Sequence, residues 1–210
     1  MNYLQLLVED IHSTIVSTIG EDGHPQVRAA DMMLWDEGGV YFLTAEGKAF
    51  YRQLIEQGFL ALAGVKDGRA VSLRGKVRCI GQDRLDDIFA AAPYMREIYP
   101  EGKRGTLRVF VIYEATGEYF DTSDPSHVVR DDVVIGGAGG DAGTGAAGGT
   151  VGGAKTYHVT DGCTGCGACL DVCPQSCIDV SGVPAVVDQH RCLHCGACVH
   201  ACPVGAIVYA

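Results

Sequence analysis

Two runs of four cysteines with the same spacing dominate the C-terminal part of this 210-residue chain. The first is CTGCGACLDVCP at residues 163–174, and the second is CLHCGACVHACP at residues 192–203. In each run the gaps between successive cysteines are two, two and three residues, and a proline follows the fourth cysteine. Eight of the ten cysteines lie in these runs. Because the gaps are so short, each run must fold as a tight loop that brings several thiols together.

Three kinds of thiol chemistry compete for this pattern. Zinc usually takes its ligands as two separated pairs, whereas each run here has four closely staggered cysteines. Disulfides need an oxidising compartment, and residues 1–10 have neither the basic start nor the apolar core of a signal peptide. The spacing is that of two 4Fe-4S clusters, for which the fourth cysteine of each run binds the other cluster. We therefore predict a cluster I on Cys163, Cys166, Cys169 and Cys202, and a cluster II on Cys192, Cys195, Cys198 and Cys173.

Glycine and proline positions within the runs agree with this prediction. Gly167 and Gly196 each follow a second cysteine, where the backbone must approach a cluster closely. Pro174 and Pro203 end the loops. Residues 157–210 thus resemble a two-cluster 4Fe-4S ferredoxin domain, with all eight ligand positions matched. The resemblance implies a domain that carries single electrons and has no substrate site of its own.

The two cysteines outside the eight ligand positions are interpreted as packing residues. Cys177 aligns with Ala206 of the second run, so we expect a small buried side chain there. Cys79 falls in a predicted strand, and we expect a buried, inert thiol.

Composition divides the chain into three parts. Residues 1–130 have strand-like and short helical patterns, residues 131–155 are rich in glycine and alanine, and residues 156–210 carry the cysteine runs. Glycine-rich sequence buries too little surface to offset its ordering entropy, so residues 131–155 are predicted to be a linker. An ordered loop is the alternative for this segment. A nucleotide-binding loop is disfavoured because no strand, helix or acidic residue frames it.

The first part is predicted to be mainly β, with a few short helices. The chain as a whole is therefore predicted to be α+β or mainly β. Residues 14–19 and 26–33 suit a hairpin around Asp22-Gly23, and residues 32–35 and 40–44 suit a second one. A helix is predicted at residues 49–57, ending at Gly58, and another at residues 84–92 before Pro93. The remaining strands are predicted at residues 59–65, 70–80 and 107–114. Many strands with short turns favour a β-barrel with added helices.

An ordered set of segments within residues 3–121 resembles the pyridoxamine 5'-phosphate oxidase-like family of FMN-binding split β-barrels. The segments are TIVSTIGEDGHPQVRAADMM, VYFLTAEGKAFYRQL, FLALAGV and VSLRGKVRCI, with YEATGEYFDTS as the closing strand. The resemblance implies a homodimer with FMN at the subunit interface. It also implies a flavin site made by Arg28, Ala29 and Ala30, by the main chain of Phe42, Leu43 and Thr44, by Lys48 at the phosphate, and by Arg74 as a second cation.

Deazaflavin F420 and haem remain alternatives to FMN. The segment TAEGKAF offers one cation, Lys48, where the family usually shows more basic and hydroxyl residues. Haem needs an axial ligand, for which His12, His24 and His127 are the candidates.

Charge and hydropathy limit the partners. The formal net charge is −10, and residues 131–210 contain only two cations, Lys155 and Arg191. Nucleic acid is therefore not an expected partner, whereas a redox protein with a basic docking patch is. No apolar stretch approaches the 18 or so residues of a membrane span, so we expect no membrane insertion and a cytoplasmic protein.

These inferences combine into one functional hypothesis. Single electrons pass through two 4Fe-4S clusters to or from an FMN, which reduces a small substrate. No catalytic residue is predicted. The alternative is a non-catalytic electron carrier or docking module whose barrel serves as a dimerisation unit.

Overall fold

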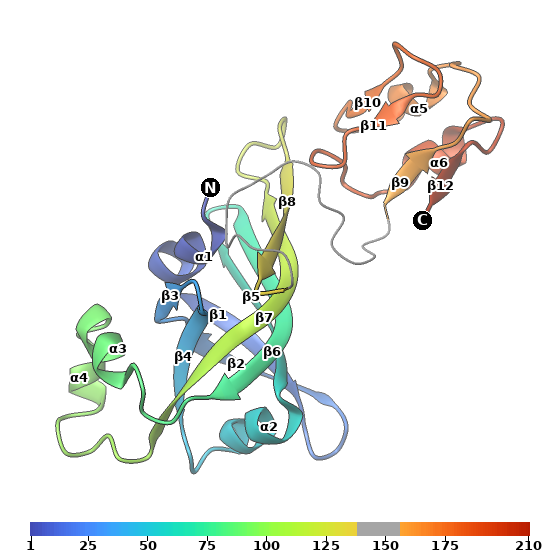
Figure 1. Ribbon diagram of the computed structural model, residues 1–210. Helices are drawn as coiled ribbons and strands as arrows, with labels where there is room; N and C mark the ends of the chain where they lie inside the picture. Colours follow the sequence, from blue (N-terminus) through green and yellow to red (C-terminus); the bar gives the residue numbers. More distant parts are fainter. Residues whose placement is uncertain (138–155) are drawn as a thin grey trace. The chain divides into compact units, whose positions relative to one another are not determined.

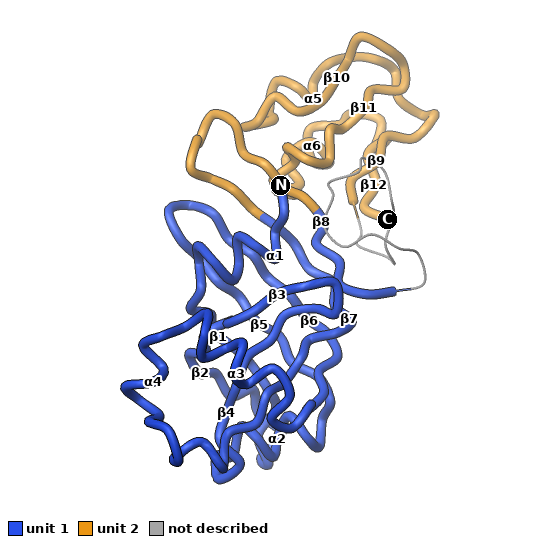
Figure 2. The backbone as a smooth tube through the Cα atoms, turned by 60° about the vertical axis from the view of Figure 1, so that its left-hand side comes forward, with its two compact units in different colours: residues 1–119, 132–145 blue, residues 120–131, 146–210 orange. Residues whose placement is uncertain are grey.

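The computed structural model describes residues 1–137 and 156–210. They form two compact units (Figure 2). Among the described residues, the first unit contains residues 1–119 and 132–137, and the second contains residues 120–131 and 156–210. Most of the predicted linker, from residue 138 onward, lies outside the described residues.

The first unit is built on one eight-stranded sheet (Figure 1). Its strand order is β2-β1-β5-β6-β7-β4-β3, with β8 paired to β7. The strands are β1 Ser13–Ile19, β2 Pro25–Asp31, β3 Leu34–Asp36, β4 Gly39–Ala45, β5 Phe59–Lys66, β6 Arg69–Cys79, β7 Leu107–Asp121 and β8 Val129–Ile135. The β1/β2, β1/β5, β5/β6, β3/β4 and β4/β7 pairs are antiparallel. Both predicted hairpins and the three later strands are therefore confirmed.

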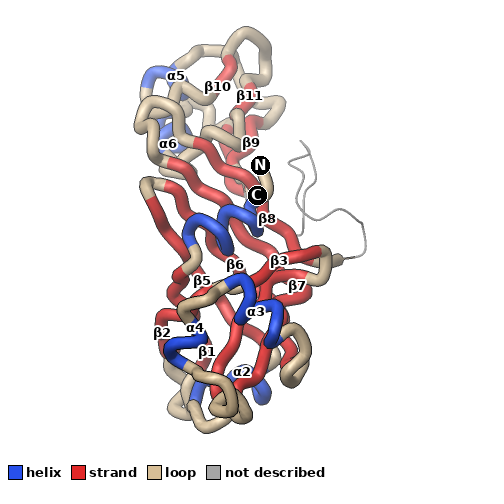
Figure 3. The backbone as a smooth tube through the Cα atoms, turned by 90° about the vertical axis from the view of Figure 1, so that its left-hand side faces the viewer, coloured by secondary structure: helices blue, strands red, loops and turns tan. Residues whose placement is uncertain are grey.

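Short helices accompany this sheet, shown in blue in Figure 3. They are α1 Tyr3–Gln5, the π-helix η1 Leu6–Ile11, α2 Ala49–Gln57, α3 Leu85–Ala91 and α4 Met95–Ile98. The predicted helix at residues 49–57 and its end at Gly58 are confirmed, because Gly58 adopts the left-handed conformation with φ 59°. The N-terminal helix was not predicted. It begins where Asn2 Oδ1 accepts hydrogen bonds from the Leu4 and Gln5 amides, both at 3.1 Å.

Strand β7 has a hydrophobic core on both of its faces. Leu107, Val109 and Val111 pack in a cluster with Ile88 and Phe89 of α3. On the other face, the fully buried Phe110 stacks on Phe42 of β4, with ring centroids 5.7 Å apart. Burial on both faces explains why residues 107–113 are almost continuously apolar instead of alternating.

The second unit consists of two short antiparallel strand pairs and two short helices. The elements are β9 Tyr157–Val159, α5 Ala168–Asp171, β10 Ile178–Asp179, β11 Val186–Val187, α6 Ala197–Ala201 and β12 Ile207–Tyr209, with β12 paired to β9 and β10 to β11. Gly167 and Gly196 precede α5 and α6 with φ 77° and 75°, so a side chain at either position would be strained.

The start of the predicted linker differs from the structure. Residues 131–135, which composition placed in the linker, complete strand β8, and Val133 and Ile135 are buried. The apolar residues 133–135 form a strand because β8 pairs with β7. Composition alone does not reveal this pairing.

Candidate functional site

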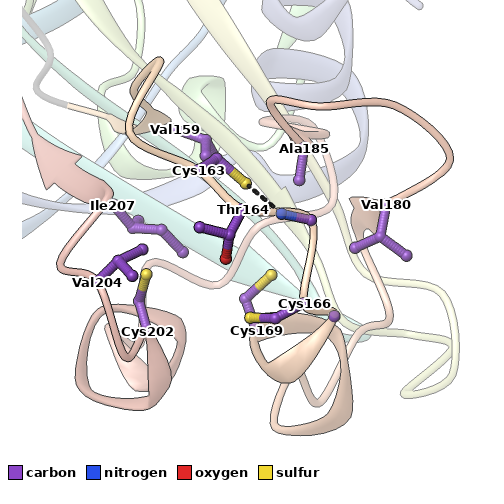
Figure 4. Close-up of a pocket in the computed structure, with 12 residues that line it drawn as sticks. Val159, Cys163, Thr164, Cys166, Cys169, Val180, Ala185, Cys202, Val204 and Ile207 are labelled. Atoms are coloured by element: carbon purple, nitrogen blue, oxygen red, sulfur yellow. Dashed lines mark hydrogen bonds between the residues drawn. The ribbon is translucent and has the colours of Figure 1, made fainter.

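Four thiols line the first of two cavities in the second unit. They belong to Cys163, Cys166, Cys169 and Cys202, the set predicted for cluster I, around a partly open space (Figure 4). The rest of the wall is largely aliphatic and comes from Val159, Val180, Ala185, Val204 and Ile207. An aliphatic, sulfur-lined space of this kind suits an iron–sulfur cluster, whose ligands are thiolates.

Backbone amides point at the sulfurs of this first cavity. Gly165 N donates to Cys163 Sγ at 3.4 Å, and Ala206 N donates to Cys202 Sγ at 3.2 Å. The amide of Ala206, followed by that of Val204, lowers the pKa of the Cys202 thiol. Burial instead raises the pKa of Cys169. The amides of this loop thus stabilise the thiolate form of Cys202.

The second cavity is lined by the thiols predicted for cluster II, those of Cys173, Cys192, Cys195 and Cys198. His194 N donates to Cys192 Sγ at 3.4 Å. Burial alone would raise the pKa of Cys173, but hydrogen bonds from the Cys177 and Gln175 amides bring it below its ordinary value. Within residues 1–137 and 156–210, no three His, Cys, Asp or Glu side chains surround the position of a single metal ion. The four thiols of each set instead line the wall of a larger space.

The structure brings the eight predicted ligands together in the predicted groups of four. Each group takes three cysteines from one run and the fourth from the other, so the two cavities share their loops. The donor set, the cavities and the amides directed at sulfur all fit 4Fe-4S clusters.

The two other cysteines have different surroundings. Cys177 is buried, as expected, but its Sγ lies 3.5 Å from Cys173 Sγ and it lines the second cavity. Burial, followed by the hydrogen bond with Cys173, raises the pKa of Cys177 to about 12. Cys79 is only half-buried, so the expectation of a buried thiol is wrong. It ends strand β6, where its Sγ accepts a hydrogen bond from Gly81 N at 3.4 Å.

Arg28, predicted to bind flavin, lies on the inner side of β2. Its guanidinium donates to Thr18 Oγ1 at 2.6 Å and to Gln53 Oε1 at 3.0 Å, and its Cζ lies 4.4 Å from the centre of the Phe50 ring. Partial burial lowers its pKa. The sequence analysis missed Gln53, which is buried and also donates to Gln26 Oε1 at 2.9 Å. The available signal was a polar residue three positions after Phe50, on the helix face that packs inward.

The side chains of the β4 residues predicted for flavin binding are buried in the core or packed against it. Phe42 and Thr44 are buried, and Leu43 packs against the α3 cluster. Their main chain pairs with β7 on one side, whereas β3 pairs only with residues 39–41. Among the described residues, the other edge of β4 at residues 42–44 has no strand partner. This edge can offer main-chain hydrogen bonds to a planar ligand.

The remaining predicted flavin residues do not converge within one chain. Lys48 is exposed at the N-cap of α2, and Arg74 is exposed on β6 opposite Ala61. Strand alternation places Arg74 and the exposed Ala29 on the outer face of the sheet, opposite to the inner face that holds Arg28. Ala30 is half-buried at the inner side. A site using all of these residues therefore needs more than one sheet face.

The three histidines considered for haem are separated. His12 Nε2 lies 3.0 Å from the Tyr94 hydroxyl and its Nδ1 3.2 Å from Val8 O. His24 is exposed in the turn before β2, and His127 is exposed in the second unit.

A family model described as pyridoxamine 5'-phosphate oxidase matches residues 3–120, more than half of the chain. The chain belongs to the pyridoxamine 5'-phosphate oxidase family. A second model, a 4Fe-4S dicluster domain, matches residues 162–206. Both resemblances seen in the sequence are thus confirmed, as is the α+β architecture of a split barrel with a small iron–sulfur domain. No curated protein matches the chain.

Among three matching solved structures, one has a TM-score above 0.5 and shares the fold of the oxidase-family unit, and two are more distant matches. A NimC/NimA family protein from Clostridium acetobutylicum is 18% identical, with a TM-score of 0.54, and the match covers 64% of this chain and 93% of that one. A haem-binding protein from Mycobacterium smegmatis is 14% identical, with a TM-score of 0.47, 63% of this chain and 57% of that one covered. An FMN-binding, oxidase-related protein from Nostoc punctiforme is 11% identical, with a TM-score of 0.39 and coverages of 62% and 93%.

None of the helices in the described parts of the chain has the length and apolar character that a membrane crossing requires.

Proposed function

We propose that this protein is a flavin- and iron–sulfur-dependent oxidoreductase in which single electrons pass through two 4Fe-4S clusters to or from FMN, and FMN reduces a small substrate. The observation that carries the proposal is the combination, in one chain, of an oxidase-family unit with two cavities of four thiols each. When bound, FMN supplies two-electron chemistry toward a substrate and one-electron exchange toward the clusters.

The chain's own residues have distinct roles in this proposal. The eight cysteines bind the clusters, and the amides of Gly165, His194 and Ala206 stabilise charge on sulfur. The free main-chain edge of residues 42–44 orients the flavin ring, and Lys48 at the N-terminus of α2 binds the phosphate. Arg28 is held rigidly by Thr18 and Gln53, so it orders the strand on which the ring rests.

An exposed apolar face of the sheet supports a homodimer. Strands β1, β2 and β5 are neighbours, and their outward side chains include Ile15, Ile19, Val27, Phe59 and Val65, with exposed fractions between 46% and 70%. Alternating with them are small residues such as Ala29 and Ala63. Apolar patches on neighbouring strands mark interaction sites. We propose that this face meets its copy and that FMN lies at the interface, which brings the separated predicted residues into one site.

The proposed electron donor or acceptor is a protein with a basic docking patch. The chain's formal charge is −10, so such a partner would associate in a salt-dependent way. The proposed setting is the cytoplasm, because thiolate ligands must stay reduced to bind clusters.

The first test is anaerobic purification followed by iron and sulfide counts and mass spectrometry of the released organic cofactor. The proposal predicts about eight irons per chain, from two four-iron clusters, together with FMN. Release of F420 or haem would replace FMN in the proposal, and iron without any organic cofactor would favour an electron carrier.

Turnover separates the enzyme from the carrier. With reduced ferredoxin or dithionite as donor, an enzyme consumes a small electrophilic substrate over many cycles, whereas a carrier exchanges electrons only stoichiometrically. Efficient reduction by NADH but not by ferredoxin would contradict the proposed electron route.

A further inference from the structure

The second unit distributes its positive charge unevenly. Its described residues, 120–131 and 156–210, contain two Lys or Arg residues, Arg130 and Arg191. Both contact residues that line the second cavity, where cluster II is predicted. The two predicted clusters therefore differ in the positive charge that surrounds them.

Arg130 lies near the start of strand β8, far from the cysteine runs in the sequence. Its Nη1 donates to Cys192 O at 3.2 Å, and its own amide donates to His190 O at 2.7 Å. His190 Nδ1 in turn lies 3.0 Å from Arg130 O and 2.9 Å from Asp131 Oδ1. The main chain of Arg130 is thus fixed by its contacts with His190, and its guanidinium donates to the main-chain oxygen of Cys192, a predicted cluster II ligand.

Gln175 connects the same segment to the other cation. Its side chain is buried, its Oε1 accepts from Val128 N at 3.3 Å, and its Nε2 donates to Pro125 O at 3.3 Å. Its main-chain oxygen accepts from Arg191 Nη2 at 2.9 Å. Because Gln175 lines the second cavity, the Arg191 guanidinium is also held next to that cavity.

The first cavity has different surroundings. Its lining is uncharged, like that of the second cavity, but the charged residues near its loop in the sequence are the acids Asp161 and Asp171. Acids also accompany the second cavity, where Asp131 and Asp188 bind His190. Those carboxylates contact His190, and the two guanidinium groups contact the main-chain oxygens of residues that line the cavity.

We infer that Arg130 and Arg191 raise the reduction potential of cluster II above that of cluster I, so that cluster II takes the first electron. This inference rests on the iron–sulfur part of the proposed function. Each cluster gains one negative charge on one-electron reduction, and a fixed positive charge nearby stabilises the reduced form. Burial of Cys192 and Cys198 opposes reduction of cluster II, but burial also lowers the local dielectric and strengthens the attraction to the two cations.

Arg130 is therefore a positioning residue that acts on potential. It belongs to residues 120–131, which contain the end of β7, the connection to β8 and the start of β8, and which form part of the second unit. A segment of the second unit outside the cysteine runs thus contributes to the electrostatics of one cluster and not of the other.

The test is an anaerobic potentiometric titration of the full-length protein with dithionite, followed by electron paramagnetic resonance. We expect two midpoints in the wild type. In Arg130→Gln the higher midpoint should fall while the lower one stays. At a fixed potential the ratio of reduced to oxidised cluster II should drop about tenfold, which is about 59 mV for a one-electron couple. Arg130→Lys, which keeps the charge, should restore most of the shift.

Two further variants test whether a change of charge shifts only the potential of the nearby cluster. Arg78→Gln removes the same charge from the first unit, where Arg78 stacks on Tyr113, and should leave both midpoints unchanged. Thr164→Lys adds a cation at the first cavity and should raise the lower midpoint.

Iron and sulfide counts accompany every titration. If both clusters are present and Arg130→Gln moves neither midpoint, moves both equally, or lowers only the lower one, the inference is wrong. If the wild type contains no clusters, the proposed function itself fails, and the counts distinguish this outcome.

Discussion

Truncation of Phe42 is the sharpest test of the barrel. The resemblance placed this residue at the flavin, but its side chain is fully buried between Phe50 and Phe110, with ring centroids 6.0 and 5.7 Å away. Both distances lie in the range of favourable aromatic pairs, each worth about 0.5–1.5 kcal/mol. A buried Phe→Ala change costs about 3–5 kcal/mol in total, so we expect Phe42→Ala to lose about 4 kcal/mol. Phe42→Leu, which refills most of the space, should lose about 1.5 kcal/mol or less.

The assay is urea unfolding followed by the fluorescence of Trp35, the only tryptophan of the chain, which lies in β3 of the first unit. With a slope of about 2 kcal/mol per molar urea, Phe42→Ala should lower the midpoint by about 2 M. Ile55→Ala, at a half-exposed position on α2, is the control and should change stability by about 0.5 kcal/mol at most. A Phe42→Ala protein with wild-type stability but without its organic cofactor would refute the assignment of this side chain to the core.

Four further outcomes are expected. Cys195→Ser should lower the iron content from about eight to about four per chain, whereas Cys79→Ser, at a residue outside both cavities, should leave it unchanged in the same assay. Gly117→Ala should destabilise the first unit by about 1–3 kcal/mol in urea unfolding, because a Cβ there would clash with Ser72 O, whereas Gly47→Ala meets no atom within 4 Å. Val27→Glu on the exposed apolar face should convert the proposed dimer into monomers in sedimentation equilibrium, and Glu56→Gln should not. Hydrogen bonds from Lys66 and then Arg69 lower the pKa of Asp10, so its contribution to stability is present above the unfolded carboxyl pKa and is lost as pH falls through the folded value. Thermal unfolding from pH 7 to pH 3 should therefore be less pH-dependent in Asp10→Asn than in the wild type.

Local sequence signals predicted most of the sheet and both sets of thiols. The hairpin at Asp22-Gly23 and the helix end at Gly58 depend on residues a few positions apart, so turn chemistry and periodicity were sufficient. Two-residue gaps bring the first three thiols of each run together, whereas the exchange of the fourth cysteine between the sets was predicted from the ligand pattern of two-cluster ferredoxins. The N-terminal helix and strand β8 were missed, since α1 depends on a cap at Asn2 and β8 on pairing with a distant strand.

Individual site residues were less predictable than the elements that carry them. A motif places Arg28 in a strand, but strand alternation and the position of α2 determine that its guanidinium meets Thr18 and Gln53. The same alternation puts Arg74 on the opposite face of the sheet. Neither outcome follows from residue type, because a shift in register by one residue would reverse both faces.

The sequence by itself determined that the C-terminal part forms two thiol-rich loops suited to iron–sulfur clusters, since eight cysteines at fixed short gaps constrain the backbone locally. Only the tertiary structure decided that Arg130, from the segment after β7, lies against Cys192 sixty-two positions further along the chain. Such contacts depend on the packing of whole elements, whose free energy is summed over many residues, so no single motif records them.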